Sequence, residues 1–204
     1  MLVLGGRMST KDIICIVIAY LMGGVCFGYY IVRIKCGIDI RESGSGGVGA
    51  RNVGRLLGKP GFILTLAGDA LKGAGAVLIA HALHISAPAV SLVLFAVIAG
   101  HIWPLPLQFR GGRGIATAIG AYLAYDYRLA LLLLGLTVLL MAFRRGFIIS
   151  GLAAFLLLPF IAFIGEYPGH VVMALTASSI IILFAHRERI RRAFAEARHT
   201  TKEA

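Results

Sequence analysis

Charged residues are scarce in this sequence, and their scarcity excludes an ordinary soluble domain. Only 14% of the 204 residues are charged, whereas a soluble domain carries about 25%. Residues 13–32 and 73–107 contain no charged side chain, and each stretch reaches the ~20 residues that a helix needs to cross a bilayer. We therefore predict an all-α integral membrane protein.

Cysteine is scarce too, and neither cysteine nor histidine is spaced for a metal. The 3 cysteines, Cys15, Cys26 and Cys36, lack the spacing of a disulfide framework or a metal site, and we interpret them as apolar filler. The 6 histidines form no HxxxH or HExxH pattern. We predict no metal and no cofactor.

Acidic residues number only 9 against 20 Lys and Arg, which gives a formal net charge of +11. A basic protein can bind nucleic acid, but this chain has no basic domain interleaved with aromatic residues, so no nucleic acid partner is predicted. Basic residues also anchor membrane proteins against anionic lipid. We assign most of the C-terminal basic residues to that role.

Apolar runs predict a bundle of about seven transmembrane helices, near 13–34, 60–84, 87–103, 114–126, 128–143, 146–165 and 168–186. Segments 114–126 and 128–143 are short for a full crossing at ~1.5 Å per residue. A pair of half-length or re-entrant helices there is an open alternative, which leaves five full crossings. We expect one transmembrane domain over residues 1–192 and a basic tail over 193–204.

Lys and Arg residues divide unevenly between the two ends of these segments. Sixteen fall in the first, third and fifth connections and the C-terminal tail, whereas the opposite side holds only Arg7, Lys11 and Arg128. Positive residues concentrate on the cytoplasmic side of a membrane. We therefore predict an outside N-terminus and a cytoplasmic C-terminus, with two glycine-rich segments facing the cytoplasm.

The first glycine-rich segment, 41–55, contains five glycines and three arginines. Exposed backbone amides and positive charge suit an anion, most often a phosphate. A flexible turn would explain the glycines but not the polar residues among them. A dinucleotide-binding G-x-G-x-x-G motif is excluded because the segment follows a membrane helix and not a strand. The predicted phosphate ligands here are Ser43, Gly44, Ser45, Gly46, Asn52 and Arg55.

The second glycine-rich segment directly precedes a predicted helix that begins near residue 114. Amides at a helix N-terminus attract anions, and an arginine within the segment adds a full charge. We predict a second phosphate site here, against the alternative of an inert turn, formed by Gly111, Gly112, Arg113 and Gly114.

Two charges interrupt the predicted helix 60–84. Asp69 and Lys72 are three residues apart and therefore share one face, where they can pair. Because charges within a bilayer are costly, the pair either faces an internal cavity or only holds the bundle together, and the two interpretations are compatible.

Two histidines lie at helix ends near the predicted phosphate sites. His101 precedes the second glycine-rich segment, and His186 leaves the last helix. His101 could carry a proton or donate to a phosphate, although a lone histidine at a helix end is more often structural.

Together these motifs resemble the bacterial acyl-phosphate:glycerol-3-phosphate acyltransferase family, in order and in spacing from Arg33 to about Arg192. The resemblance is carried by Gly44-Ser45-Gly46, Gly49-Ala50, Asn52-Val53, Arg55, Asp69, Lys72-Gly73, Gly100-His101, Pro104, Phe109, Gly111-Gly112, Gly114, Ala116-Thr117, His186-Arg187, Ile190 and Arg192.

The resemblance implies a small enzyme of the bacterial inner membrane that transfers a fatty acyl group from acyl phosphate to the 1-hydroxyl of glycerol 3-phosphate. The products are lysophosphatidic acid and phosphate, at the start of phospholipid synthesis. The essential serine and arginine of the family map to Ser45 and Arg55, and its C-terminal histidine maps to His186. The glycerol 3-phosphate site maps to Gly111–Gly114. Ser45, Arg55, His101 and His186 are the predicted catalytic residues.

The chain departs from the family pattern at Gly47, Arg51, Arg113, Arg189 and Arg198, where the family usually has Asn, Thr, Lys, Asn and Glu. One alternative is therefore a divergent paralogue with another donor or acceptor. Another is a small anion-binding transporter without chemistry, which internal symmetry would mark. No nucleophile–base pair is evident, so direct acyl transfer is the simpler mechanism. The proton acceptor stays open between His101, His186 and the donor phosphate, and no oligomeric state is predicted.

Overall fold

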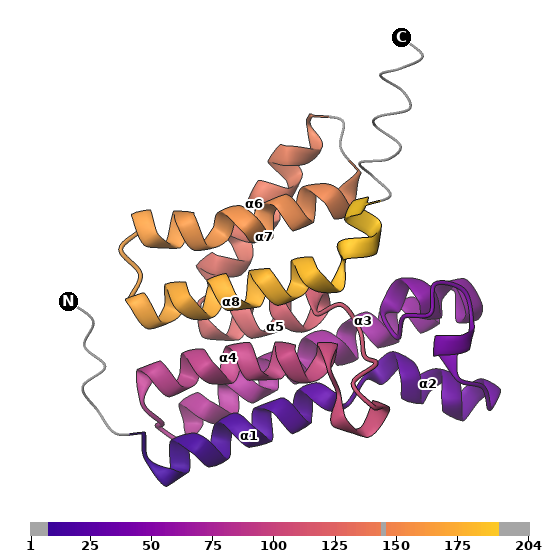
Figure 1. Ribbon diagram of the computed structural model, residues 1–204, viewed down its shortest axis with the longest axis horizontal. Coiled ribbons are helices and arrows are strands. Elements are labelled where there is room, and N and C mark those ends of the chain that lie inside the picture. The colour runs from indigo at the N-terminus through magenta and orange to yellow at the C-terminus, as the bar shows by residue number, and fades with distance from the viewer. Residues whose placement is uncertain (1–7, 144–145, 192–204) are drawn as a thin grey trace.

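The computed structural model describes residues 8–143 and 146–191. The described part is helical, which confirms the all-α class (Figure 1). The α-helices are α1 (Thr10–Gly24), α2 (Phe27–Cys36), α3 (Ala50–Ala82), α4 (Ala87–Ile102), α5 (Ile115–Tyr125), α6 (Tyr127–Met141), α7 (Phe147–Ile164) and α8 (Gly169–Ala185), and 3₁₀ turns occupy η1 (Ile40–Glu42) and η2 (Leu105–Leu107).

Four helical stretches of the described chain are long and apolar enough to cross a membrane: Thr10–Cys36, Ala50–Ala82, Ala87–Leu107 and Phe147–Ile164. Helices α5, α6 and α8 are apolar but shorter. Large apolar side chains are exposed along α1, α6 and α7, as expected for surfaces that face lipid. The predicted tail 193–204, together with Arg144, Arg145 and Arg198, lies outside the described residues.

The first predicted helix is in fact two helices. The sequence predicted one helix over 13–34, whereas α1 ends at Gly24 and α2 begins at Phe27. The break contains no proline, and the local signal for it is the glycine pair Gly23–Gly24 at the end of α1. Its backbone groups bind side chains of α3, described below.

Helix α3 begins ten residues earlier than its predicted start at 60. Residues 50–55, expected as part of a loop, form the first turns of this helix. Gly58, with φ 69° and ψ −164°, kinks the helix just before Pro60. Gly58 supplies this positive φ, which glycine adopts readily, and Pro60, two residues later, has no amide hydrogen to continue the helical bonding across the kink.

Close contacts at glycines hold the central helices together. A Cβ atom at Gly23 would collide with the carbonyl of Val97 in α4, and one at Gly120 in α5 would collide with the carbonyl of Ala70 in α3. Small residues allow this approach of backbones, which is a main source of helix association in membranes. The α1–α4 and α3–α5 pairs are thereby the most extensive helix contacts in the described part of the chain.

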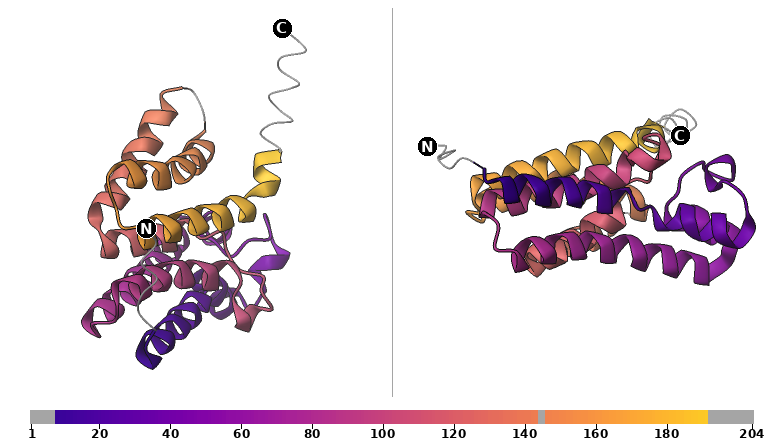
Figure 2. Two further views of the ribbon diagram at one scale, coloured as in Figure 1. Left: turned by 60° about the vertical axis from the view of Figure 1, so that its left-hand side comes forward. Right: turned by 90° about the horizontal axis from the view of Figure 1, so that it is seen from below.

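The connections gather at two ends of the bundle. Helix α2, η1, the segment between η2 and α5, and the C-terminal end of α8 lie at one end, at the right of Figure 1. The start of α1 and the turns between α3 and α4 and between α7 and α8 lie at the other end, and both views of Figure 2 agree. The two glycine-rich segments therefore lie at the same end of the molecule.

Candidate active site

Asn52 organises the first glycine-rich segment from within. Its side-chain amide nitrogen donates to the carbonyls of Ser43 (2.9 Å), Gly47 (2.9 Å) and Ile40 (3.3 Å), while its oxygen accepts from the amide of Ser45 (2.9 Å). These contacts use both hydrogens of the side-chain amide. The sequence predicted Asn52 as a phosphate ligand. We propose instead that Asn52 shapes the segment and does not itself contact a phosphate.

Gly44 fits closely against this asparagine. Its backbone has φ 60°, a left-handed conformation that favours glycine. A Cβ atom there would also collide with the side-chain oxygen of Asn52. Gly44 is therefore needed by the shape of the loop, independently of any ligand.

Two of the predicted phosphate ligands, Ser45 and Arg55, are exposed at this end. Arg51 is exposed as well, and it lies with Arg55 on the first turns of α3. Because the two arginines are four residues apart, they share one helix face. The expected guanidinium groups are thus presented by a helix rather than by a loop.

Arg41 ties the first glycine-rich segment to the second, a role that the sequence analysis missed. Its guanidinium group bonds Asp39 at 2.6 Å, donates to the carbonyl of Leu107 in η2 at 2.9 Å, and lies 5.2 Å from the ring centre of Tyr29. The hydrogen bond from Arg41 is the main cause that lowers the pKa of Asp39 below its usual value. The close Asp39–Arg41 spacing was the available sequence signal.

The second glycine-rich segment folds back on the end of α4. The amide of Gly111 donates to the carbonyl of Ile102 (3.2 Å), and the amide of Gly112 donates to the carbonyl of His101 (2.9 Å). A Cβ atom at Gly112 would collide with the His101 ring. Both amides are therefore engaged within the protein, and we propose Arg113 and the first amides of α5, after Gly114, as the phosphate ligands here.

His186 is buried where α8 ends, close to Arg113. Its Nδ1 lies 2.8 Å from the carbonyl of Ile182, and because a carbonyl only accepts, Nδ1 carries the proton and Nε2 has the free lone pair. Burial is the main cause that lowers the pKa of His186 to about 4; the Ile182 carbonyl opposes this shift, and Arg113 and Arg189 add to it. The imidazole is therefore neutral at pH 7.

Asp69 and Lys72 form the predicted ion pair inside the bundle. Lys72 Nζ lies 3.0 Å from Asp69 Oδ1, and both side chains are at most 4% exposed. The same ammonium lies 2.8 Å from Nδ1 of His101, which is also buried. His101 is thus part of an internal polar cluster that adjoins the second glycine-rich segment.

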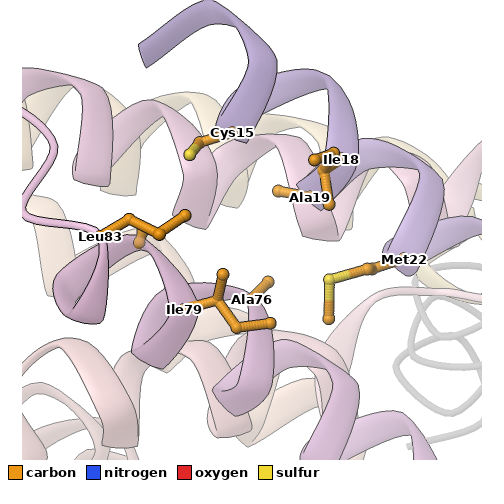
Figure 3. A pocket seen from close by; sticks show the side chains of 8 residues that line it. Cys15, Ile18, Ala19, Met22, Ala76, Ile79 and Leu83 are labelled. Atoms are coloured by element: carbon orange, nitrogen blue, oxygen red, sulfur yellow. The ribbon is translucent and has the colours of Figure 1, made fainter. Parts of the chain in front are cut away.

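Two hollows of the described structure lie away from these residues. A narrow cleft between α1 and α3 has a volume of about 20 Å³ and purely apolar walls. Figure 3 shows its lining side chains, which include Cys15, Ile18, Met22, Ala76 and Leu83. A wider apolar groove of about 490 Å³ runs along α6 beside Arg128. Among residues 8–143 and 146–191, no three His, Cys, Asp or Glu side chains gather as a metal site.

Comparison with known proteins gives consistent matches over most of the chain. Residues 13–196 match the family described as glycerol-3-phosphate acyltransferase. Glycerol-3-phosphate acyltransferase 1 of Desulfitobacterium hafniense (strain Y51) is 46% identical over 180 residues, covering 88% of this chain and 89% of that protein. Glycerol-3-phosphate acyltransferase 1 of Bacillus cereus is 37% identical over 182 residues, covering 89% and 99%.

Two solved structures share the fold. Both are crystal structures of PlsY (YgiH), an integral membrane glycerol 3-phosphate acyltransferase, one in a glycerol 3-phosphate form and one in a lysophosphatidic acid form. Their TM-scores are 0.83 and 0.81 at 32% and 31% identity, with 91% of this chain and 93% of each of those chains covered.

Proposed function

Because the chain belongs to the glycerol-3-phosphate acyltransferase family, we propose that it transfers a fatty acyl group to the 1-hydroxyl of glycerol 3-phosphate, with acyl phosphate as the donor. The products are lysophosphatidic acid and inorganic phosphate, at the start of phospholipid synthesis. The 46% identity over 88% of the chain is the observation that carries this conclusion. It favours an enzyme over the anion-binding transporter that the charge pattern alone left open.

The protein is a multi-pass membrane protein, and its active site faces the cytoplasm of a bacterial cell. The support is the asymmetry of charge between its ends. The end with both glycine-rich segments carries Arg33, Lys35, Arg41, Arg51, Arg55, Lys59, Arg110, Arg113, Arg187, Arg189 and Arg191, whereas the described part of the other end carries Lys11 and Arg128. This distribution follows the positive-inside rule.

The two substrates each bring a phosphate, and exposed or half-buried arginines at the same end can offset their charge. Arg51 and Arg55 come from the start of α3, while Arg113 and Arg189 lie near His186. Arginine can bind two phosphate oxygens at once. We assign the acyl phosphate to the first segment and glycerol 3-phosphate to the second. Holding both reactants side by side supplies much of the rate by orientation.

Acyl transfer proceeds in one step. The 1-hydroxyl oxygen of glycerol 3-phosphate attacks the acyl carbon, and the bond from this carbon to the phosphate oxygen breaks. We assign to Ser45 a hydrogen bond to the carbonyl oxygen as negative charge develops there. The proton of the hydroxyl passes to the leaving phosphate, because His186, with a pKa of about 4, is a weak base. His186 accepts a hydrogen bond through Nε2 instead.

Purified protein with palmitoyl phosphate and glycerol 3-phosphate tests this function. We expect equal amounts of released phosphate and lysophosphatidic acid, measured colorimetrically and by mass spectrometry. Arg55→Ala and Ser45→Ala are expected to lose at least ~100-fold in kcat/KM, as the removal of one transition-state donor does. Product formed only with acyl-CoA or acyl carrier protein would identify a paralogue with a different donor.

A further inference from the structure

The break between α1 and α2 has an unusual hydrogen-bonding arrangement. In an unbroken helix the carbonyl of Gly23 would accept from the amide of Phe27. Here the Gly23 carbonyl accepts from Lys72 Nζ at 2.8 Å, and the Phe27 amide donates to Asp69 Oδ1 at 3.4 Å. The ion pair of α3 therefore replaces one backbone hydrogen bond of the first helix.

Lys72 makes a second hydrogen bond to the backbone at the break: its ammonium donates to the carbonyl of Val25 at 2.7 Å. Backbone groups inside a membrane require partners within the protein, and the ammonium supplies them to two carbonyls. The broken helix and the buried charges thus satisfy one another. This accounts for a break that contains no proline.

His101 connects this ion pair to the second glycine-rich segment. The Lys72 ammonium group can only donate hydrogen bonds. In its 2.8 Å contact with His101, Nδ1 is therefore the acceptor, and the ring proton is on Nε2. The Nε2 side of the ring packs against Gly112, where a Cβ atom would collide with it, and the His101 carbonyl accepts the Gly112 amide at 2.9 Å. Arg113 follows directly.

We propose that Asp69, Lys72 and His101 form a positioning centre that fixes the second glycine-rich segment against the α1–α2 break, and thereby sets the place of Arg113. On the proposed function, which this inference extends, the centre fixes the acceptor subsite without touching substrate. All three side chains are buried. A shift of the His101 ring releases Gly112, and a misplaced reactant costs up to about 100-fold in rate.

Hydrogen exchange of the peptide that covers residues 107–117 tests the centre directly in the purified full-length protein. His101→Leu removes the acceptor of Lys72 and replaces the imidazole with a buried apolar side chain. We expect exchange in this peptide to become about tenfold faster, because the Gly111 and Gly112 amides lose protection. The KM for glycerol 3-phosphate should rise by about tenfold, while the KM for acyl phosphate changes by less than about threefold.

Two further variants separate positioning from general destabilisation. His101→Gln keeps an oxygen that can accept from Lys72 and should recover most of the protection. Asp12→Asn alters a buried carboxylate at the opposite end of α1, where Asp12 binds Ser9 and Ser86. This control should lower the melting temperature but leave the exchange of 107–117 and both KM values unchanged.

Wild-type exchange in 107–117 for His101→Leu, in protein that is monodisperse by size exclusion, would overturn the proposal. Lys72→Met provides the same test from the other side of the contact. If either His101→Leu or Lys72→Met fails to fold, the hydrogen exchange of residues 107–117 in the other variant and in His101→Gln tests the proposal. Absence of acyltransferase activity in the wild type would instead refute the proposed function, because the exchange measurement does not depend on turnover.

Discussion

Asn52 shows how one side chain can hold a functional loop from within. Four hydrogen bonds converge on its amide, from η1 to the start of α3. Residue types had indicated a polar, anion-binding segment, but not which polar groups are already engaged. Donors look alike in sequence, and only the folded backbone decides which of them bind carbonyls of the same loop.

Replacing Asn52 by Asp should open the first segment. The carboxylate keeps the acceptor for Ser45 but loses the donor to the carbonyls of Ser43 and Gly47. Each unsatisfied buried group costs about 1–3 kcal/mol. We expect a lower melting temperature and a large loss of kcat, with rapid proteolysis of residues 41–52. Activity and proteolysis like those of the wild type would contradict the assigned role.

His186 should leave a signature in the pH dependence of stability. Its folded-state pKa of about 4 lies below the usual 6.5, so the unfolded chain takes up a proton in a window where the folded protein does not. The contribution of His186 to stability therefore falls as the pH drops from 6.5 to 4 and levels off below. His186→Gln should show a shallower fall between pH 7.5 and 4.5 in thermal unfolding. Equal slopes of stability against pH for the wild type and His186→Gln would refute the lowered pKa of His186.

At the scale of helices, the positions of most elements could be predicted because long apolar runs are a strong signal. Two features could not. The break after Gly24 depends on Lys72 and Asp69 from another helix, and the start of α3 lies in a segment whose glycines resembled a loop. At the break, contacts with residues distant in sequence override the local apolar pattern. At the start of α3, the backbone is helical although the glycines there are typical of a loop.

Glycines at helix contacts should be intolerant of even one methyl group. Gly120→Ala places a Cβ atom against the Ala70 carbonyl, and such overpacking costs about 1–3 kcal/mol. Gly135→Ala in α6 is the matched control, because nothing lies within 4 Å of the added atom. We expect a lower melting temperature for Gly120→Ala and an equal or higher one for Gly135→Ala, since alanine favours a helix by ~0.5–1 kcal/mol. Similar shifts in both would exclude close backbone packing as the cause.

For the whole molecule, the gathering of both glycine-rich segments at one end follows from the order of the helices. Each full crossing takes the chain to the opposite side of the membrane, so counting the predicted crossings between the two segments could place both on the same side. It could not show that Arg41 bonds Leu107 or that Arg113 adjoins His186, because lateral packing depends on side chains far apart in sequence. The site is therefore assembled by contacts between helices that their individual patterns do not specify.

The natural cysteines allow the orientation of this end to be measured. Cys36 is exposed at the end of α2, whereas Cys15 and Cys26 are buried. If the active site faces the cytoplasm, a membrane-impermeant maleimide should label the protein in inverted vesicles but not in intact spheroplasts. Gly169→Cys, introduced with Cys36→Ser, places the thiol on an open surface at the opposite end and should reverse the pattern. Labelling of Cys36 from outside would place the site on the wrong side to meet cytoplasmic glycerol 3-phosphate.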